Sequence, residues 1–161
     1  MKSRIEQPKV FISYAWGSQE HDEKVIALAT NLKGDGVDVV FDKWQLKEGN
    51  DTFSFMEKSV MDESITNVLI LMDPIYAKKA NERAGGVGTE TQIISSEVYN
   101  KVEQRKFIPV VFERDIDGNV CKPQYLKSIY ISIYQRRIHM IQSISEWCVH
   151  FTALILIRSL T

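Results

Sequence analysis

Residues 9–14 read Lys-Val-Phe-Ile-Ser-Tyr, a short and almost wholly apolar run close to the start of the sequence. A run of this kind is typical of a β-strand that is covered on both faces, as in the middle of a parallel sheet. Residues 66–72, Thr-Asn-Val-Leu-Ile-Leu-Met, have the same character. Together the two runs predict a buried parallel sheet, in which the first strand is central.

The segments around these two runs alternate between helical and extended patterns. After a polar loop, Asp22 can serve as the N-cap of a helix whose apolar residues recur at helical spacing until Gly34. Residues 76–83 are polar and predict a mobile connection. The remaining expected elements are strands at 37–42, 106–113 and 128–134, a helix that Asp51 opens, and a helix from about residue 89 to 104.

This order of elements predicts the fold class. Most of the expected strands follow their predecessors through a connection of helix length, which favours a three-layer α/β/α fold with a five-stranded parallel sheet. Pro109 lacks an N–H, so the strand that contains it is expected at an edge, or Pro109 at a strand end. With 161 residues, of which 44% are apolar and 25% charged, the chain is expected to form one globular domain.

Composition argues against several classes of function. The net charge is −1 and the 20 basic residues are scattered among 21 acidic ones, so a nucleic-acid partner is not expected. Cys121 and Cys148 share no ligand spacing with His21, His139 or His150, which predicts neither a metal site nor a disulfide framework. No apolar run has the length of a signal peptide or a membrane span, so we expect a cytoplasmic protein.

The last segment, residues 135–161, is more apolar than a closing surface helix should be. We interpret it as a helical element that packs on the domain or faces a partner. A truncated junction to a further domain is the alternative interpretation.

The segment 84–94 reads Ala-Gly-Gly-Val-Gly-Thr-Glu-Thr-Gln-Ile-Ile, a flexible glycine loop that runs into apolar residues at helical spacing. Glu90 is therefore expected in the first turn of a helix. A carboxylate in that place has a purely structural explanation, because it gains about 0.3–1 kcal/mol from the helix dipole. Gly86 and Gly88 resemble part of a dinucleotide fingerprint, but Thr91 replaces its third glycine, so we reject that interpretation.

The chain resembles a Toll/interleukin-1 receptor (TIR) domain, of the bacterial kind that acts as an NAD-consuming immune effector. The resemblance rests on four motifs within residues 9–133: the strand at 10–14, the passage from Phe41 and Asp42 to Gly49 (the family's BB loop), the strand at 68–71, and residues 107–111. It implies a flavodoxin-like sheet and a role in anti-phage defence.

In enzymatic TIR domains a glutamate near the start of the third helix is catalytic, and the resemblance implies that Glu90 has this role. Glycines and Val87 stand where the family has a tryptophan. Glu97 is the rival for the role, although it precedes Lys101 by four residues, the spacing of an ordinary surface ion pair.

The loops that follow the first two strands carry the expected substrate-binding residues, because ligands bind at the carboxyl ends of parallel strands. Aromatic faces suit adenine or nicotinamide. The candidates are Tyr14, Trp16, Phe41, Asp42 and Trp44. Phe41 is also a natural core residue, whereas both tryptophans lie in polar loops.

Two functions of different classes remain open. The first is an NAD+ glycohydrolase that releases nicotinamide and ADP-ribose or a cyclic isomer, has NAD+ as a substrate and needs no cofactor. The resemblance implies that it is activated by head-to-tail association of copies through Trp44, Leu46 and Gly49, under the control of a fused or separate sensor domain. The second is a non-enzymatic signalling adaptor that assembles through the same loops.

Overall fold

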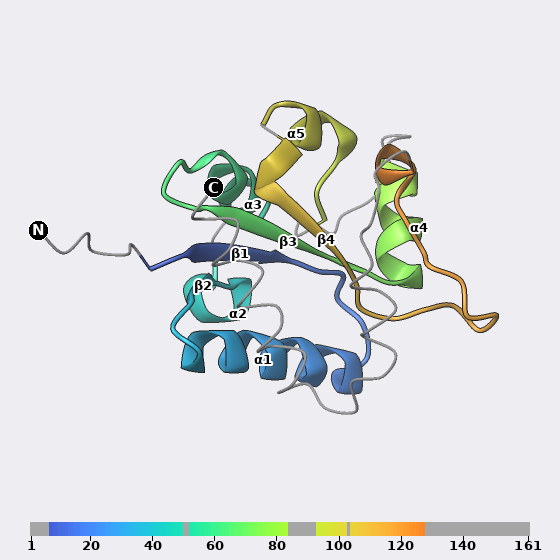
Figure 1. The fold of residues 1–161 in the computed structure, drawn as a ribbon, viewed down its shortest axis with the longest axis horizontal. Coiled ribbons are helices and arrows are strands. Elements are labelled where there is room, and N and C mark those ends of the chain that lie inside the picture. Colours follow the sequence, from blue (N-terminus) through green and yellow to red (C-terminus); the bar gives the residue numbers. More distant parts are fainter. Residues whose placement is uncertain (1–6, 50–51, 84–92, 103, 128–161) are drawn as a thin grey trace, which may run out of the picture.

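The computed structural model describes residues 7–49, 52–83, 93–102 and 104–127 (Figure 1). Its centre is a parallel sheet of four strands in the order β2-β1-β3-β4. The strands are β1 (Lys9–Ser13), β2 (Asp38–Val40), β3 (Asn67–Met72) and β4 (Phe107–Val111). The predicted parallel sheet and the inner position of β1 are confirmed. The expected fifth strand at 128–134 and the segment 135–161 lie outside the described residues.

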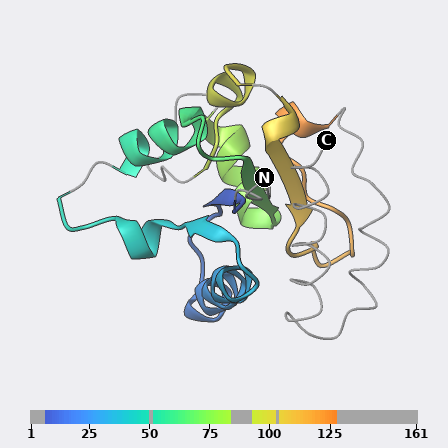
Figure 2. The same cartoon turned by 60° about the vertical axis from the view of Figure 1, so that its left-hand side comes forward.

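Helices cover both faces of the sheet and make the predicted three layers (Figure 2). One face packs against α1 (Gln19–Gly34), and the other packs against α3 (Thr52–Met61), α4 (Pro74–Arg83) and α5 (Ser96–Asn100). Shorter elements are α2 (Asp42–Gln45), η1 (Gln104–Lys106) and η2 (Gln124–Leu126). No helix among the described residues is long and apolar enough to cross a membrane.

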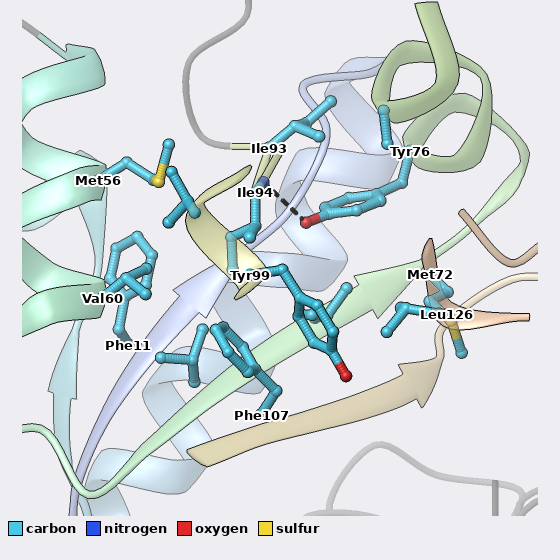
Figure 3. Packing of buried hydrophobic residues seen from close by; sticks show 14 of the residues in the cluster. Phe11, Met56, Val60, Met72, Tyr76, Ile93, Ile94, Tyr99, Phe107 and Leu126 are labelled. Carbon is cyan, nitrogen blue, oxygen red and sulfur yellow. Dashed lines mark hydrogen bonds between the residues drawn. The ribbon is translucent and has the colours of Figure 1, made fainter. Parts of the chain in front are cut away.

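The alternation of side chains along each strand divides the core between the two faces. Val10 and Ile12 of β1 belong to the cluster on the α1 side, whereas Phe11 lies with Met56 and Val60 of α3 on the other side (Figure 3). Every residue of β3 is buried, because this strand has a neighbour on each edge and helices on each face. This explains why residues 68–72 of this strand are an unbroken apolar run.

Two expected boundaries were wrong. The N-cap of α1 is Ser18, whose hydroxyl accepts a hydrogen bond from the His21 N–H, and Asp22 lies inside the first turn. The segment after β2, expected as a loop, begins with the single helical turn α2. Phe41 therefore precedes a helix and does not end a long strand.

The expectation of a mobile connection at 76–83 was also wrong, because these residues belong to α4. Asp73 Oδ1 accepts a hydrogen bond of 2.7 Å from the Tyr76 N–H, and Pro74 is the first helical residue. Both are standard features of a helix start. Tyr76 is fully buried, so the helix presents its polar side chains outward and packs Tyr76 and Ala80 inward.

The helix expected from about 89 to 104 is much shorter. Ser95 is the N-cap of α5, since its hydroxyl accepts from the Val98 N–H, and the helix itself begins only at Ser96. Ile93 and Ile94 are buried, as their apolar character predicts, but they precede the helix. The described helix therefore has Glu97 in its first turn, whereas Glu90 lies outside the described residues.

Candidate functional site

The loops at the carboxyl ends of β1 and β2 meet around one buried carboxylate. Asp42 is the first residue of α2, and its side chain is buried. Tyr14 Oη donates to its Oδ1 at 2.9 Å and lies 3.2 Å from its Oδ2, and Trp16 Nε1 donates to Oδ2 at 3.2 Å. Burial raises the pKa of the Tyr14 hydroxyl, and the charge of Asp42 raises it further. Tyr14 therefore stays a hydrogen-bond donor that fixes the carboxylate.

The aromatic rings around Asp42 form a continuous group. The Tyr14 and Phe41 ring centroids are 5.4 Å apart, and Phe41 meets Trp44 edge-to-face at 5.3 Å. Tyr14 and Phe41 are fully buried, whereas Trp16 and Trp44 are 43% and 41% exposed. The structure thus brings together all five residues expected to bind substrate. Only the two tryptophans offer ring surface to a ligand or partner.

The exposed ring of Trp44 is held by contacts on α1 as well as by Phe41. Lys33 Nζ lies 5.2 Å from the Trp44 ring centroid, which is a cation–π distance. Lys43, the residue before Trp44, pairs through Nζ with Asp22 Oδ2 at 3.0 Å near the other end of α1. These contacts fix α2 against α1, so Trp44 is presented at a defined place.

The other residues expected to mediate self-association follow α2. Leu46 is the C-cap of α2 and is half-buried, and its N–H donates to the Asp42 carbonyl at 2.8 Å. Gly49 is exposed and has a φ of 86°, a conformation that L side chains rarely adopt. This conformation favours a glycine at position 49.

Two tyrosines hold the backbone directly after the glycine segment. The Ile94 N–H donates to Tyr76 Oη at 3.1 Å (Figure 3). Tyr125 Oη donates to the Ile94 carbonyl at 2.6 Å. Tyr76 Oη also lies 2.8 Å from the Ser13 hydroxyl at the end of β1. Residue 94 is therefore fixed against the carboxyl end of an inner strand. Of the two candidate catalytic glutamates, Glu90 lies outside the described residues and Glu97 is placed by its backbone alone.

A second polar cluster at the same sheet edge was missed by the sequence analysis. The buried ring of His21 lies between two carboxylates: Nε2 is 3.4 Å from Asp73 Oδ2, and Nδ1 is 3.5 Å from Glu113 Oε1. His21 Nε2 is also 3.1 Å from the Ala15 carbonyl, and a Cβ on Gly17 would lie 2.9 Å from the ring. The sequence signal was the place of Asp73, directly after a buried strand.

Asp73 is unusual because its carboxylate is buried with one oxygen poorly satisfied. Oδ2 has no hydrogen-bond partner among the described residues and meets His21 only at ion-pair distance. Burial, and secondarily the charge of Glu113, raise the pKa of Asp73, while the Tyr76 N–H and His21 oppose the shift. Within the described residues no three His, Cys, Asp or Glu side chains are grouped as metal ligands would be.

Comparison with known proteins identifies the family of this chain. The model of the SEFIR domain family matches residues 8–153, which is most of the chain. The chain belongs to the SEFIR domain family. A solved structure described as a prokaryotic SEFIR domain is 39% identical, with a TM-score of 0.68, and the match covers 85% of this chain and 100% of that one. No curated protein matches.

SEFIR domains are members of the TIR-like superfamily, so the resemblance to TIR domains is confirmed at the level of the superfamily. The α/β fold is also that of the solved SEFIR domain. The cluster around Asp42 lies on the segment that was compared with the BB loop. The SEFIR domain thus presents two half-exposed tryptophans at the sheet edge where folds of this class bind ligands.

Proposed function

We propose that this SEFIR domain is an NAD+ glycohydrolase that self-association activates, and that it acts in bacterial anti-phage defence. It cleaves the bond between nicotinamide and ribose, and the other product is ADP-ribose or a cyclic isomer. The supporting observation is the pair of tyrosines that holds Ile94, because it ties the chain after the glycine segment to the carboxyl end of β1.

The tie matters because Glu90 is close to it in sequence. Glu90 precedes Ile94 by four residues, and four residues of fully extended chain span at most about 14 Å. The loop that follows β1 carries Trp16, which donates to Asp42. Chain connectivity therefore supports an acidic side chain within reach of the edge that carries the exposed tryptophans.

One carboxylate is sufficient for this reaction. When the C–N bond breaks, its electron pair goes to the ring nitrogen, so the cationic nicotinamide ring leaves as a neutral molecule and needs no proton. An ionised glutamate holds the ribose hydroxyls and stabilises the positive charge that develops at the anomeric carbon. Water then attacks that carbon and releases a proton. Attack by a group of the ADP-ribose gives the cyclic isomer instead.

The exposed ring surfaces of Trp16 and Trp44 suit the flat bases of NAD+. Asp42 does not act on the substrate in this proposal. It is buried beneath the rings and accepts hydrogen bonds from Tyr14 and Trp16, so it sets the orientation of the indole of Trp16.

Nicotinamide release from NAD+ by the concentrated protein tests the proposal. Glu90→Gln should abolish release and leave the unfolding midpoint unchanged, because the amide keeps the shape and removes only the charge. Glu97→Gln is the matched control and should keep most of the activity. Loss of release in Glu97→Gln with normal turnover in Glu90→Gln would transfer the catalytic role to Glu97, which lies in the first turn of α5.

A signalling adaptor is the second candidate function, and the exposure of Trp44 favours it equally. An adaptor needs the self-association surface but no acid. If the wild-type protein releases no nicotinamide even when fused to a domain that clusters it, the adaptor function replaces the enzymatic one.

A further inference from the structure

The strand β2 lies at one end of the described sheet, so one of its edges faces away from β1. Asp38 and Val40 direct their backbone groups toward β1: Asp38 is in register with Lys9, Val40 is in register with Phe11, and the Asp38 N–H donates to Pro8 at 2.9 Å. Because backbone groups alternate along a strand, those of Val39 and Phe41 point to the outer edge.

The side chain of Gln45 occupies this outer edge. Its Oε1 accepts a hydrogen bond of 2.7 Å from the Phe41 N–H, and its Nε2 donates to the Val39 carbonyl at 3.4 Å. The Phe41 carbonyl is occupied too, since it accepts from the N–H groups of Trp44 and Gln45 at 3.0 and 3.1 Å. The side-chain amide has the same donor and acceptor as a peptide group, so Gln45 takes the place that one peptide unit of a neighbouring strand would take.

We propose that Gln45 closes the β2 edge against strand pairing with a second copy of this chain. An open edge is a template for another strand, and two identical edges are complementary to each other in an antiparallel, twofold arrangement. The groups that Gln45 occupies at the outer edge are the Phe41 N–H and the Val39 carbonyl. Antiparallel strands pair by exchanging N–H and C=O groups of this kind. Closure of this edge leaves contacts between copies to other surfaces, such as the exposed ring of Trp44.

The short helix α2 explains how a single side chain reaches both groups. The turn from Asp42 to Gln45 folds the chain back, so that Gln45 lies beside the strand that precedes it. Gln45 is an exposed residue, so its two hydrogen bonds add little to stability. The main effect of these hydrogen bonds is that the outer backbone groups of Val39 and Phe41 are no longer available to another strand. The inference does not depend on whether the domain cleaves NAD+.

Gln45→Ala tests the proposal by two measurements, both made in a Trp44→Ala background so that the contact expected of Trp44 is absent. The first is hydrogen exchange at a concentration where the protein is monomeric. The Phe41 N–H should exchange at least tenfold faster, whereas the Asp38 N–H, which bonds to Pro8, should keep its rate. The second is sedimentation over a hundredfold concentration range, in which only the protein with Gln45→Ala should dimerise.

Gln19→Ala is the matched control, since Gln19 is an exposed glutamine that bonds only to Glu23 on its own helix among the contacts described. It should change neither measurement. If Gln45→Ala fails to fold, Gln45→Leu replaces it, because a leucine keeps much of the side-chain volume but can neither accept from the Phe41 N–H nor donate to the Val39 carbonyl. An unchanged exchange rate of Phe41 would overturn the hydrogen bonding. Faster exchange without dimerisation would show that the edge needs no closure.

Discussion

Tyr14 Oη lies 2.9 Å from Asp42 Oδ1, and this hydrogen bond joins the residue after β1 to the residue that begins α2. Both side chains are buried, so the bond is shielded from water. The same carboxylate accepts from Trp16. One buried carboxylate therefore joins the two loops that carry the exposed tryptophans, and it fixes their positions at the carboxyl ends of the strands.

Tyr14→Phe removes only the hydroxyl group and leaves the Asp42 carboxylate with one donor fewer. We expect the free energy of unfolding to fall by about 1–3 kcal/mol, the cost of an unpaired buried polar group. Urea unfolding measures it. Tyr99→Phe is the matched control, because the Tyr99 hydroxyl is buried and has no hydrogen-bond partner among the described residues. An equal loss in both variants would show that the bond to Asp42 is not the cause.

Tyr76→Phe breaks the hydrogen bonds to the Ser13 hydroxyl and the Ile94 N–H. We expect a loss of about 1–3 kcal/mol in the free energy of unfolding. Nicotinamide release per folded molecule should fall as well, since the chain after Glu90 loses an anchor. A variant that is less stable but equally active would separate the anchor from catalysis.

Trp44→Ala should weaken the self-association of the domain, because a half-exposed aromatic ring on a surface helix is a typical interface anchor. Specific activity should no longer rise with protein concentration, whereas the free energy of unfolding should change by no more than about 1 kcal/mol. Ile116→Ala is the control, since Ile116 is fully exposed in a distant turn. A Trp44→Ala protein that unfolds would place the ring in the core.

Asp73→Asn should change how stability depends on pH. Because burial raises the pKa of Asp73 in the folded protein above its ordinary value of 3.8, the folded state keeps this proton at a pH where the unfolded chain has released it. This carboxyl group therefore makes the wild type less stable as the pH rises from about 4 through the raised pKa. The asparagine cannot titrate and still accepts from the Tyr76 N–H.

Urea unfolding of both proteins at pH 4, 5.5 and 7 measures this difference. The stability of Asp73→Asn relative to the wild type should increase with pH across that window and then level off. A constant difference at all three values would show that Asp73 titrates alike in the folded and unfolded states.

The sequence by itself determined the sheet and the family resemblance. A strand with neighbours on both edges and helices on both faces is apolar over most of its length, so the apolar run at residues 68–72 predicted β3 without any knowledge of its partners. The apolar face of α1 could also be predicted from the sequence, because its buried residues Val25, Leu28 and Leu32 recur at helical spacing. The expected group around Asp42 followed from the rule that the carboxyl ends of parallel strands meet at one edge.

Only the tertiary structure decided the remainder, because it depends on contacts between segments that are distant in sequence. The sequence of α4 is mostly polar, so its pattern did not predict a helix. Its buried side includes Tyr76, which reaches Ser13 and Ile94. The apolar spacing that begins with Ile93 and Ile94 predicted a helix from about residue 89, but Tyr76 and Tyr125 bind the peptide groups of Ile94 that a helix would have used. In the same way, His21 reaches Asp73 and Glu113 only because α1 begins where β3 and β4 end. Hydrophobic patterns report which side of a segment is buried, whereas the choice of polar partners is made only when the segments have packed.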